Sequence, residues 1–186
     1  MKYVNRELKG TYGYIRKQTI FEIVKTLVMF AMAFGIFLIG FLTLGTKKSL
    51  WSVFAVLALL PASKSLVGVI MLARFRSLGE ELYLRLSDAA GQLPALYENI
   101  LTTQERTFFV PVICYASGDL IAYNEKDAAG VKEHLDKVFA AAGTSVSVKV
   151  FSDEAGFEKR ARQMAENLRA DTKYESVFNT IKAVSL

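Results

Sequence analysis

The chain has 186 residues, of which 52% are hydrophobic, and a formal net charge of +5 at pH 7. This length allows a membrane-spanning unit plus one soluble domain of about 80 residues, without a third domain. Residues 1–106 carry a net charge of +6 and residues 107–186 carry −1. A nucleic-acid interface would need a basic patch on the soluble part, so this distribution excludes nucleic acid as a partner. The single cysteine, Cys114, excludes an internal disulfide and favours a reducing compartment.

Residues 1–25 form a basic segment in which tyrosines alternate with Lys and Arg. This mixture is typical of an amphipathic helix at the level of lipid headgroups, although Gly10 and Gly13 fit a frayed tail equally well. The segment is too long and too polar to begin a cleaved signal peptide. We expect the basic residues that flank the apolar stretches to contact anionic headgroups. These residues are Lys9, Arg16, Lys17, Lys25, Arg74 and Arg76.

Two apolar stretches, residues 26–45 and 50–73, are separated by only four residues. In a helix that rises about 1.5 Å per residue, twenty residues span roughly the 30 Å hydrocarbon core of a bilayer. The short link predicts a transmembrane hairpin of two antiparallel helices. More Lys and Arg flank the outer ends than the link, which predicts that both termini are cytoplasmic. We therefore expect an integral protein of a bacterial-type cell membrane.

Small residues recur four positions apart in both stretches, as Ala31 and Gly35 in the first and Ala58 and Ala62 in the second. Small side chains let helix backbones approach closely in lipid. Folding the hairpin about its link brings the two pairs to a similar depth, so we expect them to pack against each other. The alternative is that they face outward and pair with a second copy.

Lys64 and Pro61 interrupt the second stretch. An ionisable residue inside a span is a candidate for ion or substrate passage. However, Lys64 lies near the predicted cytoplasmic end, where its long side chain is able to reach the interface. We favour this second interpretation over a transport site.

Residues 74–106 are expected to form an amphipathic helical connector. Leucines recur at helical spacing from Leu78 to Leu86, with charged residues between them. Gly91 and Pro94 should end this helix, and residues 94–102 are expected to form a second short helix.

Residues 107–186 are expected to form a cytoplasmic α/β domain. Residues 107–116 and 120–123 predict a β-hairpin, in which Pro111 restricts the first strand to beginning after it or lying at an edge there. Asp127 and Asp153 should cap two helices on either side of a strand at residues 145–151. The end of the chain, from Tyr174, fits a last helix or an edge strand over residues 178–186. The order β-β-α-β-α predicts a mixed sheet of three or four strands.

No pattern for catalysis, a metal or a cofactor emerges from these residues. Asp119, Glu125 and Lys126, near the ends of a predicted strand, are the only candidates for a metal-dependent hydrolase or nuclease. Alternation along a strand would put Glu125 and Lys126 on opposite faces, which argues against a shared metal ion. His134 has no second histidine or cysteine near it in sequence, which argues against a zinc site. No glycine-rich phosphate loop is present. We therefore expect no catalytic, metal-binding or cofactor-binding residue.

The leading hypothesis is a non-enzymatic module that a helical hairpin anchors to a membrane with anionic headgroups. Its cytoplasmic domain would act as a binding, adaptor or regulatory unit for a protein partner or a second copy. The alternatives are a metal-dependent hydrolase or nuclease that uses Asp119 and Glu125, and a small transporter or channel subunit organised around Lys64 and Pro61.

Overall fold

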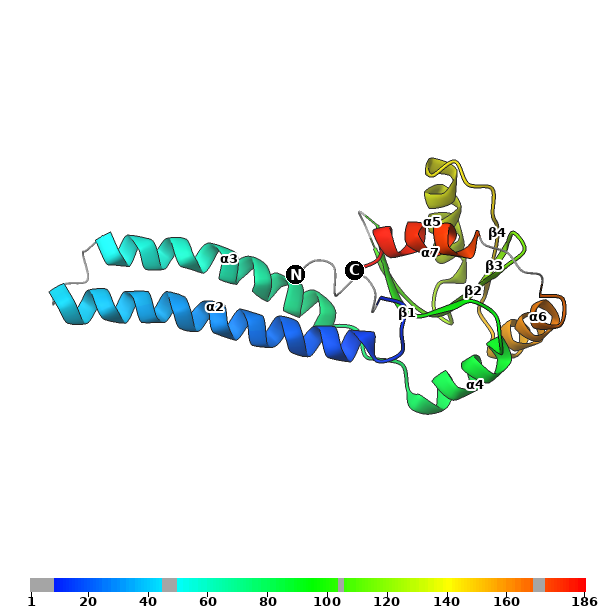
Figure 1. Cartoon of the computed structure of the whole chain (residues 1–186), viewed down its shortest axis with the longest axis horizontal. Coiled ribbons are helices and arrows are strands. Elements are labelled where there is room, and N and C mark those ends of the chain that lie inside the picture. The colour runs from blue at the N-terminus through cyan, green and yellow to red at the C-terminus, as the bar shows by residue number, and fades with distance from the viewer. Residues whose placement is uncertain (1–8, 45–49, 104–105, 169–172) are drawn as a thin grey trace. The chain divides into compact units, whose positions relative to one another are not determined.

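The computed structural model describes residues 9–44, 50–103, 106–168 and 173–186. It divides into two compact units (Figure 1). The helix-pair unit is Ile15–Arg76, and the α/β unit combines Met1–Tyr14 with Ser77–Leu186. Residues 1–8 of the N-terminal segment and the predicted link between the two apolar stretches lie outside the described residues.

The helix-pair unit consists of α2 (Tyr14–Leu44) and α3 (Leu50–Ala73), which run antiparallel and side by side (Figure 1). The bounds of α3 are those predicted, and Pro61 lies inside it. In contrast, α2 begins at Tyr14, well before the apolar stretch at residue 26. The polar residues between them, such as Arg16, Lys17 and Gln18, are good helix formers, so the helix extends through them.

The contact face of α2 repeats every seven residues, because Thr26, Ala33 and Gly40 are the buried positions in its apolar part. On α3 the buried positions include Ala55 and Ala62, again seven residues apart. A seven-residue repeat is the pattern of two helices that wind around each other with a left-handed twist.

This pattern differs in part from the expected packing of small residues. Ala62 is fully buried, and Ala58 and Gly35 are half-buried, whereas Ala31 is exposed. The seven-residue repeat places Ala33 against α3, and Ala31 is about 200° away from it around the helix axis. The spacing within one helix therefore identified small residues but not the face of α2 that packs against α3.

The α/β unit contains a four-stranded mixed sheet, in the order β1-β2-β3-β4. The strands are β1 (Ala95–Thr102), β2 (Thr107–Ala116), β3 (Asp119–Tyr123) and β4 (Ser147–Phe151). Strand β2 is antiparallel to both β1 and β3, and β4 is parallel to β3. This confirms the predicted β-hairpin and the mixed sheet. Ser117 and Gly118 at its turn both have positive φ, as tight hairpin turns of the primed types require.

Residues 95–102 form strand β1, so the prediction of a second short helix there was wrong. Leu96, Ile100 and Leu101 have helical spacing, but pairing with β2 at every residue of β1 except Glu98 overrides that local preference. The preceding helix, α4 (Glu80–Ala90), ends at Gly91 as predicted. The connector therefore supplies an edge strand and a helix of the α/β unit.

Pro111 lies inside β2, which begins at Thr107. Pairing of β2 with β3 starts at Val112, so the missing N–H of Pro111 interrupts no pair with β3. The sequence offered two alternatives for this strand. It does not begin after Pro111; instead, Pro111 lies at a position of β2 that has no β3 residue beside it.

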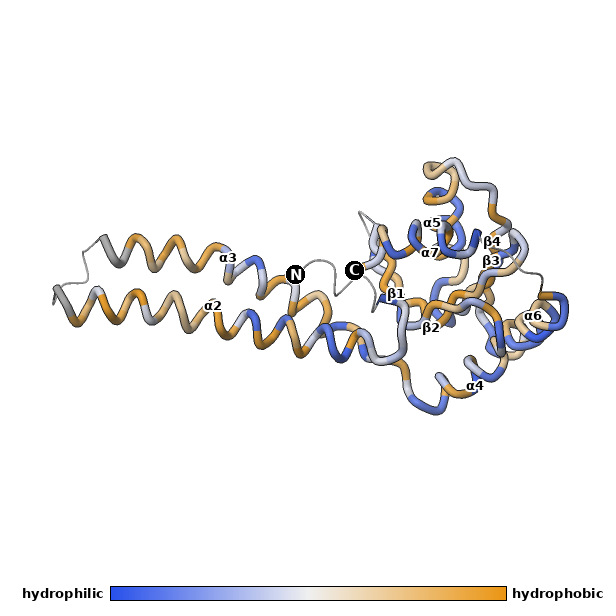
Figure 2. Tube along the Cα trace, viewed as in Figure 1, coloured by the Kyte–Doolittle hydropathy of each residue, from blue (hydrophilic) through white to orange (hydrophobic). Residues whose placement is uncertain are grey.

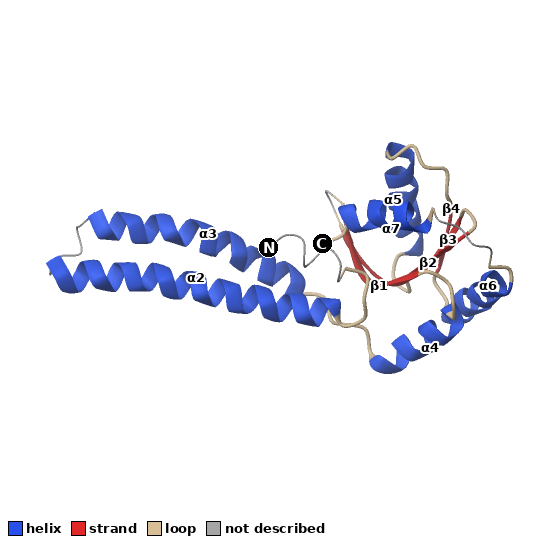
Figure 3. Cartoon of the chain, viewed as in Figure 1, coloured by secondary structure: helices blue, strands red, loops and turns tan. Residues whose placement is uncertain are grey.

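Two helices cover each face of the sheet (Figure 3). Helices α4 and α6 (Glu154–Glu166) lie on one face, and α5 (Ala128–Ala141) and α7 (Tyr174–Val184) lie on the other. The carboxylates of Asp127 and Asp153 cap α5 and α6, accepting hydrogen bonds from the N–H groups of Gly130 (2.9 Å) and Gly156 (2.6 Å). The end of the chain is helical, and only Ser185 forms an isolated bridge, with Leu101 of β1.

Each face of the sheet has its own hydrophobic core. The core under α5 and α7 includes Phe139, Leu135 and Ile181, and the core under α4 and α6 includes Phe157, Leu86 and Cys114. Ile113 and Cys114, adjacent on β2, are both fully buried on opposite faces. The sheet is therefore the buried middle layer of the unit.

Residues 9–14 pack on the α/β unit, although we expected residues 1–25 to lie at the membrane surface. The Lys9 ammonium donates hydrogen bonds to the carbonyl oxygens of Ser185 (2.7 Å) and Lys182 (3.4 Å) at the end of α7. A cation is stabilised there by the exposed carbonyl groups of the last helical turn. Lys9 thus contacts the α/β unit, in contrast to the predicted headgroup contact.

Candidate functional site

Most residues along the traces of α2 and α3 are hydrophobic (Figure 2), and many of their side chains are exposed. Of 25 exposed large hydrophobic side chains among the described residues, 22 lie on α2 and α3. They include Leu27, Phe34 and Leu42 on α2 and Val56 and Leu60 on α3. Only 17% of the most apolar stretch of each helix is buried, and both helices are long enough to cross a membrane. A core helix of a soluble protein would be mostly buried instead.

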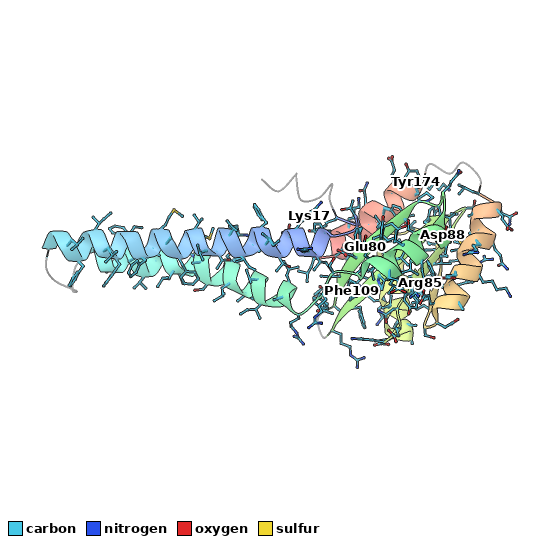
Figure 4. All side chains as sticks on the ribbon, turned by 90° about the horizontal axis from the view of Figure 1, so that it is seen from below. Lys17, Glu80, Arg85, Asp88, Phe109 and Tyr174 are labelled. Atoms are coloured by element: carbon cyan, nitrogen blue, oxygen red, sulfur yellow. The ribbon has the colours of Figure 1, made fainter. Side chains whose placement is uncertain are left out.

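Basic side chains gather at one end of the helix pair. Arg16 and Lys17 are exposed in the first turn of α2, and Arg74 and Arg76 are exposed just after α3 ends (Figure 4 labels Lys17). Because the two helices are antiparallel, these four residues lie at the same end. We call them the basic collar. The whole unit, residues 15–76, contains eight Lys and Arg and a single acidic residue, Glu22.

Glu22 is the centre of a polar cluster between the helices, adjacent to the basic collar. Its carboxylate forms an ion pair with Lys25, and its side chain is only 14% exposed. The Ser65 hydroxyl of α3 donates to the same carboxylate at 3.4 Å. The Thr26 hydroxyl lies 2.8 Å from the Ser65 hydroxyl and completes a polar link between α2 and α3.

Sequence reasoning did not identify this cluster. The available signal was the spacing of Gln18, Glu22 and Thr26, which places three polar side chains on one helix face. Their partner Ser65 is distant in the sequence, and only the antiparallel pairing brings it to them. Within the unit the cluster fixes the register of the two helices.

Lys64 lies next to this cluster but points away from it, because its side chain is exposed whereas Ser65 is buried. The bond between Thr26 and Ser65 places Lys64 at the level of Leu27, near the basic end of the pair. Pro61 is also exposed. The arrangement therefore supplies no enclosed polar path around Lys64 and Pro61 within the described part of the helices.

Asp119 and Glu125 do not come together in the α/β unit. Asp119 begins β3 and forms an ion pair with Arg160 of α6 at 2.8 Å. Glu125 is exposed beyond the other end of β3. At about 3.3 Å per residue, a five-residue strand separates its ends by roughly 13 Å, too far for one metal ion. Among the described residues, no group of three His, Cys, Asp or Glu side chains is placed to hold a metal.

The remaining reactive side chains of this unit are not activated. Burial lowers the pKa of His134, with a smaller contribution from the charge of Lys137, so this half-buried imidazole is neutral at pH 7. Burial raises the pKa of the Cys114 thiol to about 12, which keeps it protonated. A neutral thiol without exposed surface is a poor nucleophile.

Charged residues on the α4 and α6 side pair with one another. Arg85 of α4 contacts Glu154 at 2.7 Å, and Arg162 of α6 contacts Asp88 at 3.4 Å (Figure 4 labels Arg85 and Asp88). Helix α6 carries a basic cluster, Lys159, Arg160 and Arg162. Arg160 also bonds to Asp119, so these contacts argue against a separate anion site at this cluster. Its two arginines already bind carboxylates.

A shallow groove of about 860 Å³ lies between α5 and α7. Its lining is a mixture of apolar residues, such as Ala142 and Ala183, and neutral polar residues, such as Ser176 and Asn179, with Glu175 as its one charged residue. This lining contains no pair of groups suited to acid-base or nucleophilic chemistry.

No family model matches the chain, and comparisons with curated proteins and with solved structures likewise found no match. The features that bear on function are therefore the apolar helix pair, its basic collar and the folded α/β unit.

Proposed function

We propose that α2 and α3 cross a lipid bilayer as an antiparallel hairpin and anchor the α/β domain to the membrane as a non-enzymatic binding module. The observation that carries this proposal is the apolar surface of the helix pair. Burying a large apolar side chain is worth about 1.5–3 kcal/mol. The free-energy cost of leaving 22 such side chains in water would therefore exceed the net stability of a typical whole domain, about 5–15 kcal/mol.

The basic collar supports a cytoplasmic location for both termini. Lys and Arg near the ends of membrane helices are retained on the cytoplasmic side, and each contributes about 1 kcal/mol near anionic lipid. Residues 77–186 carry a net charge of −4, so anionic headgroups would attract the collar and repel the domain. We infer from this charge distribution that the anchor binds the lipid headgroups, and that the domain binds a protein partner or a second copy.

Membrane topology is testable with single cysteines in a Cys114→Ala background. We expect Asn167→Cys, on the exposed surface of the α/β domain, to react with an impermeant maleimide only when the cytoplasmic face is open. Lys47→Cys, between the two apolar stretches, should react from the opposite side. Labelling of both positions from the same side, or release of the chain by alkaline carbonate, would rule out the hairpin anchor.

The binding role requires that partners recognise the domain. We expect the proteins that cross-link to the full chain, including a second copy, to be lost when residues 77–186 are removed. Partners that remain bound to α2 and α3 alone would instead assign the interaction to the membrane and contradict the module.

A further inference from the structure

The middle of β1 contacts both segments that join the α/β unit to the rest of the chain. The incoming segment is residues 9–14, which precede and begin α2, and the outgoing segment is residues 77–79, which follow α3. These segments are far apart in the sequence. Their contacts on β1 are made by two consecutive residues, Tyr97 and Glu98.

The incoming segment is held by a backbone hydrogen bond, because the Tyr97 N–H donates to the Gly10 carbonyl at 2.8 Å. Gly10 has φ +86°, and a Cβ atom there would lie 2.4 Å from Leu96 Cδ2. Only glycine therefore fits at this position. The close approach fixes the segment against the outer edge of β1.

A stack of tyrosine rings strengthens the same attachment. The Tyr12 ring is stacked on the Tyr83 ring of α4, with centroids 4.0 Å apart. Tyr83 in turn contacts the Tyr97 ring edge-on at 5.0 Å. The incoming segment is thus tied to β1 by both its backbone and a side chain.

The outgoing segment is held by the carboxylate of Glu98. One oxygen, Oε1, accepts a hydrogen bond from the Leu78 N–H at 2.8 Å and another from the Ser77 hydroxyl. Glu98 is only 1% exposed, so these bonds are shielded from water. A charged acceptor in such a place forms stronger hydrogen bonds than a neutral one.

The backbone of β1 is irregular at the same point. Glu98 has φ +52°, a conformation uncommon for residues other than glycine and costly in a strand. The strand pairing passes from Tyr97 and Val112 directly to Asn99 and Val110, on either side of Pro111.

The irregularity shifts the alternation of side chains between the two faces. Val112 packs under α4 and α6 whereas Val110, two residues away, packs under α5 and α7. Strict alternation would put both on one face. The two strands therefore change phase together at this position, which adjoins both cores.

We propose that Tyr97 and Glu98 form a coupling point, at which displacement of one connecting segment is passed through β1 to the other. The α/β domain would then respond to changes in the spacing of the two segments that lead to the helix pair. This inference concerns the α/β unit itself and stands whether or not the helix pair spans a membrane.

Two backbone amides report the two attachments separately. The Tyr97 N–H reports the bond to Gly10, and the Leu78 N–H reports the bond to Glu98. We would measure their hydrogen exchange in the full chain in detergent micelles. Ser77→Ala removes one hydrogen bond to Glu98, and Gly10→Ala removes the fit of the incoming segment.

Coupling predicts that each variant accelerates exchange at both amides. Ser77→Ala should raise the rate at Tyr97, and Gly10→Ala the rate at Leu78, by roughly 3- to 10-fold, the effect of losing about one hydrogen bond. The Val131 N–H in α5 should change little. If Gly10→Ala does not fold, Tyr12→Ala, which removes only the ring stack, serves in its place.

The matched control is Gly143→Ala. Gly143 also has positive φ, +64°, but nothing lies within 4 Å of its would-be Cβ atom, and it follows α5. This variant should leave the ratio of the Tyr97 and Leu78 rates to that of Val131 unchanged. The proposal is wrong if each variant accelerates only the amide of its own segment, or if Gly143→Ala reproduces the same pattern.

Discussion

Cys114 on β2 has no exposed surface, and burial raises the pKa of its thiol to about 12 from a usual value near 9. The folded state therefore disfavours the thiolate. The contribution of this residue to stability is complete below about pH 9 and is lost as the pH rises from about 9 towards 12.

We predict that the free energy of unfolding of the wild type falls more steeply above pH 9 than that of Cys114→Ala. The difference between their slopes should approach 1.4 kcal/mol per pH unit, roughly the value for one proton. Urea unfolding in mild detergent at pH 8 and pH 10.5, followed by near-ultraviolet circular dichroism, measures it. Parallel slopes for the two proteins would show that the thiol is not buried as described.

Single residues differ in how far their roles were predictable from the sequence. Asp127 and Asp153 were predicted as helix caps from the sequence. This was possible because a capping carboxylate binds a backbone N–H only three positions away, as both do here. Glu22 and Glu98 were not identified, since their partners Ser65 and Leu78 lie 43 and 20 residues away. Roles fixed by local geometry can be inferred from the sequence, and roles fixed by tertiary pairing cannot.

On each face of the sheet, one helix contributes a fully buried aromatic ring. Phe139 of α5 and Phe157 of α6 belong to different cores. We predict that Phe139→Ala and Phe157→Ala each lower the free energy of unfolding by about 3–5 kcal/mol, the usual cost of such a cavity. The double variant should show nearly additive losses, because the sheet separates the two sites.

Leu168→Ala is the control for these variants, because this leucine, just past the end of α6, is 37% exposed and should change stability by less than about 0.5 kcal/mol. Thermal melts of the three single variants and the double variant test the prediction. A loss in the double variant far below the sum would mean that the two cores are one.

Helix α4 and strand β1 precede residue 107, so the α/β unit begins earlier in the chain than the sequence predicted, and this boundary is testable. A fragment of residues 107–186, the domain expected from the sequence, lacks the edge strand that pairs with β2 along its whole length. We predict that this fragment does not fold, as judged by amide dispersion in NMR spectra. A fragment of residues 77–186 should regain native dispersion but remain less stable than the full chain, because residues 9–14 no longer cover β1.

The missed strand shows where sequence reasoning fails at this scale. Hydrophobic residues at 96, 100 and 101 fit a helix, and the change of phase at Glu98 removes the alternation typical of a strand. The strand β4, in contrast, alternates regularly and was predicted correctly. A strand whose conformation depends on its neighbour cannot be identified from its own residues.

For the molecule as a whole, the position of Lys64 helps to distinguish a membrane anchor from a transport unit. Its side chain is exposed near the basic end of the helix pair, so in the proposed anchor it needs only to reach the lipid interface. We predict that Lys64→Leu inserts with unchanged topology and yield and leaves partner cross-linking unchanged. Loss of partner binding with normal insertion would give Lys64 a role that the anchor does not require.

The long-range organisation was partly predictable, because the short link between the two apolar stretches favours antiparallel pairing of α2 and α3. The assignment of residues 9–14 to the α/β unit was not predictable, since it depends on the fit of Gly10 against Leu96 and of Lys9 against the end of α7. Charge and hydropathy indicate whether a segment prefers water or an apolar environment, but they do not identify the surface on which it packs.

The contact between Lys9 and Ser185 opens a route to a water-soluble form of this domain by circular permutation. The Lys9 ammonium and the Ser185 carbonyl are 2.7 Å apart, and the Leu186 N–H donates to Ile100 on the same strand that receives Gly10. A few glycine and serine residues could therefore join Leu186 to Lys9. The rearranged polypeptide, residues 77–186 followed by residues 9–14, would contain both segments that bond to β1 and would omit the apolar helices α2 and α3.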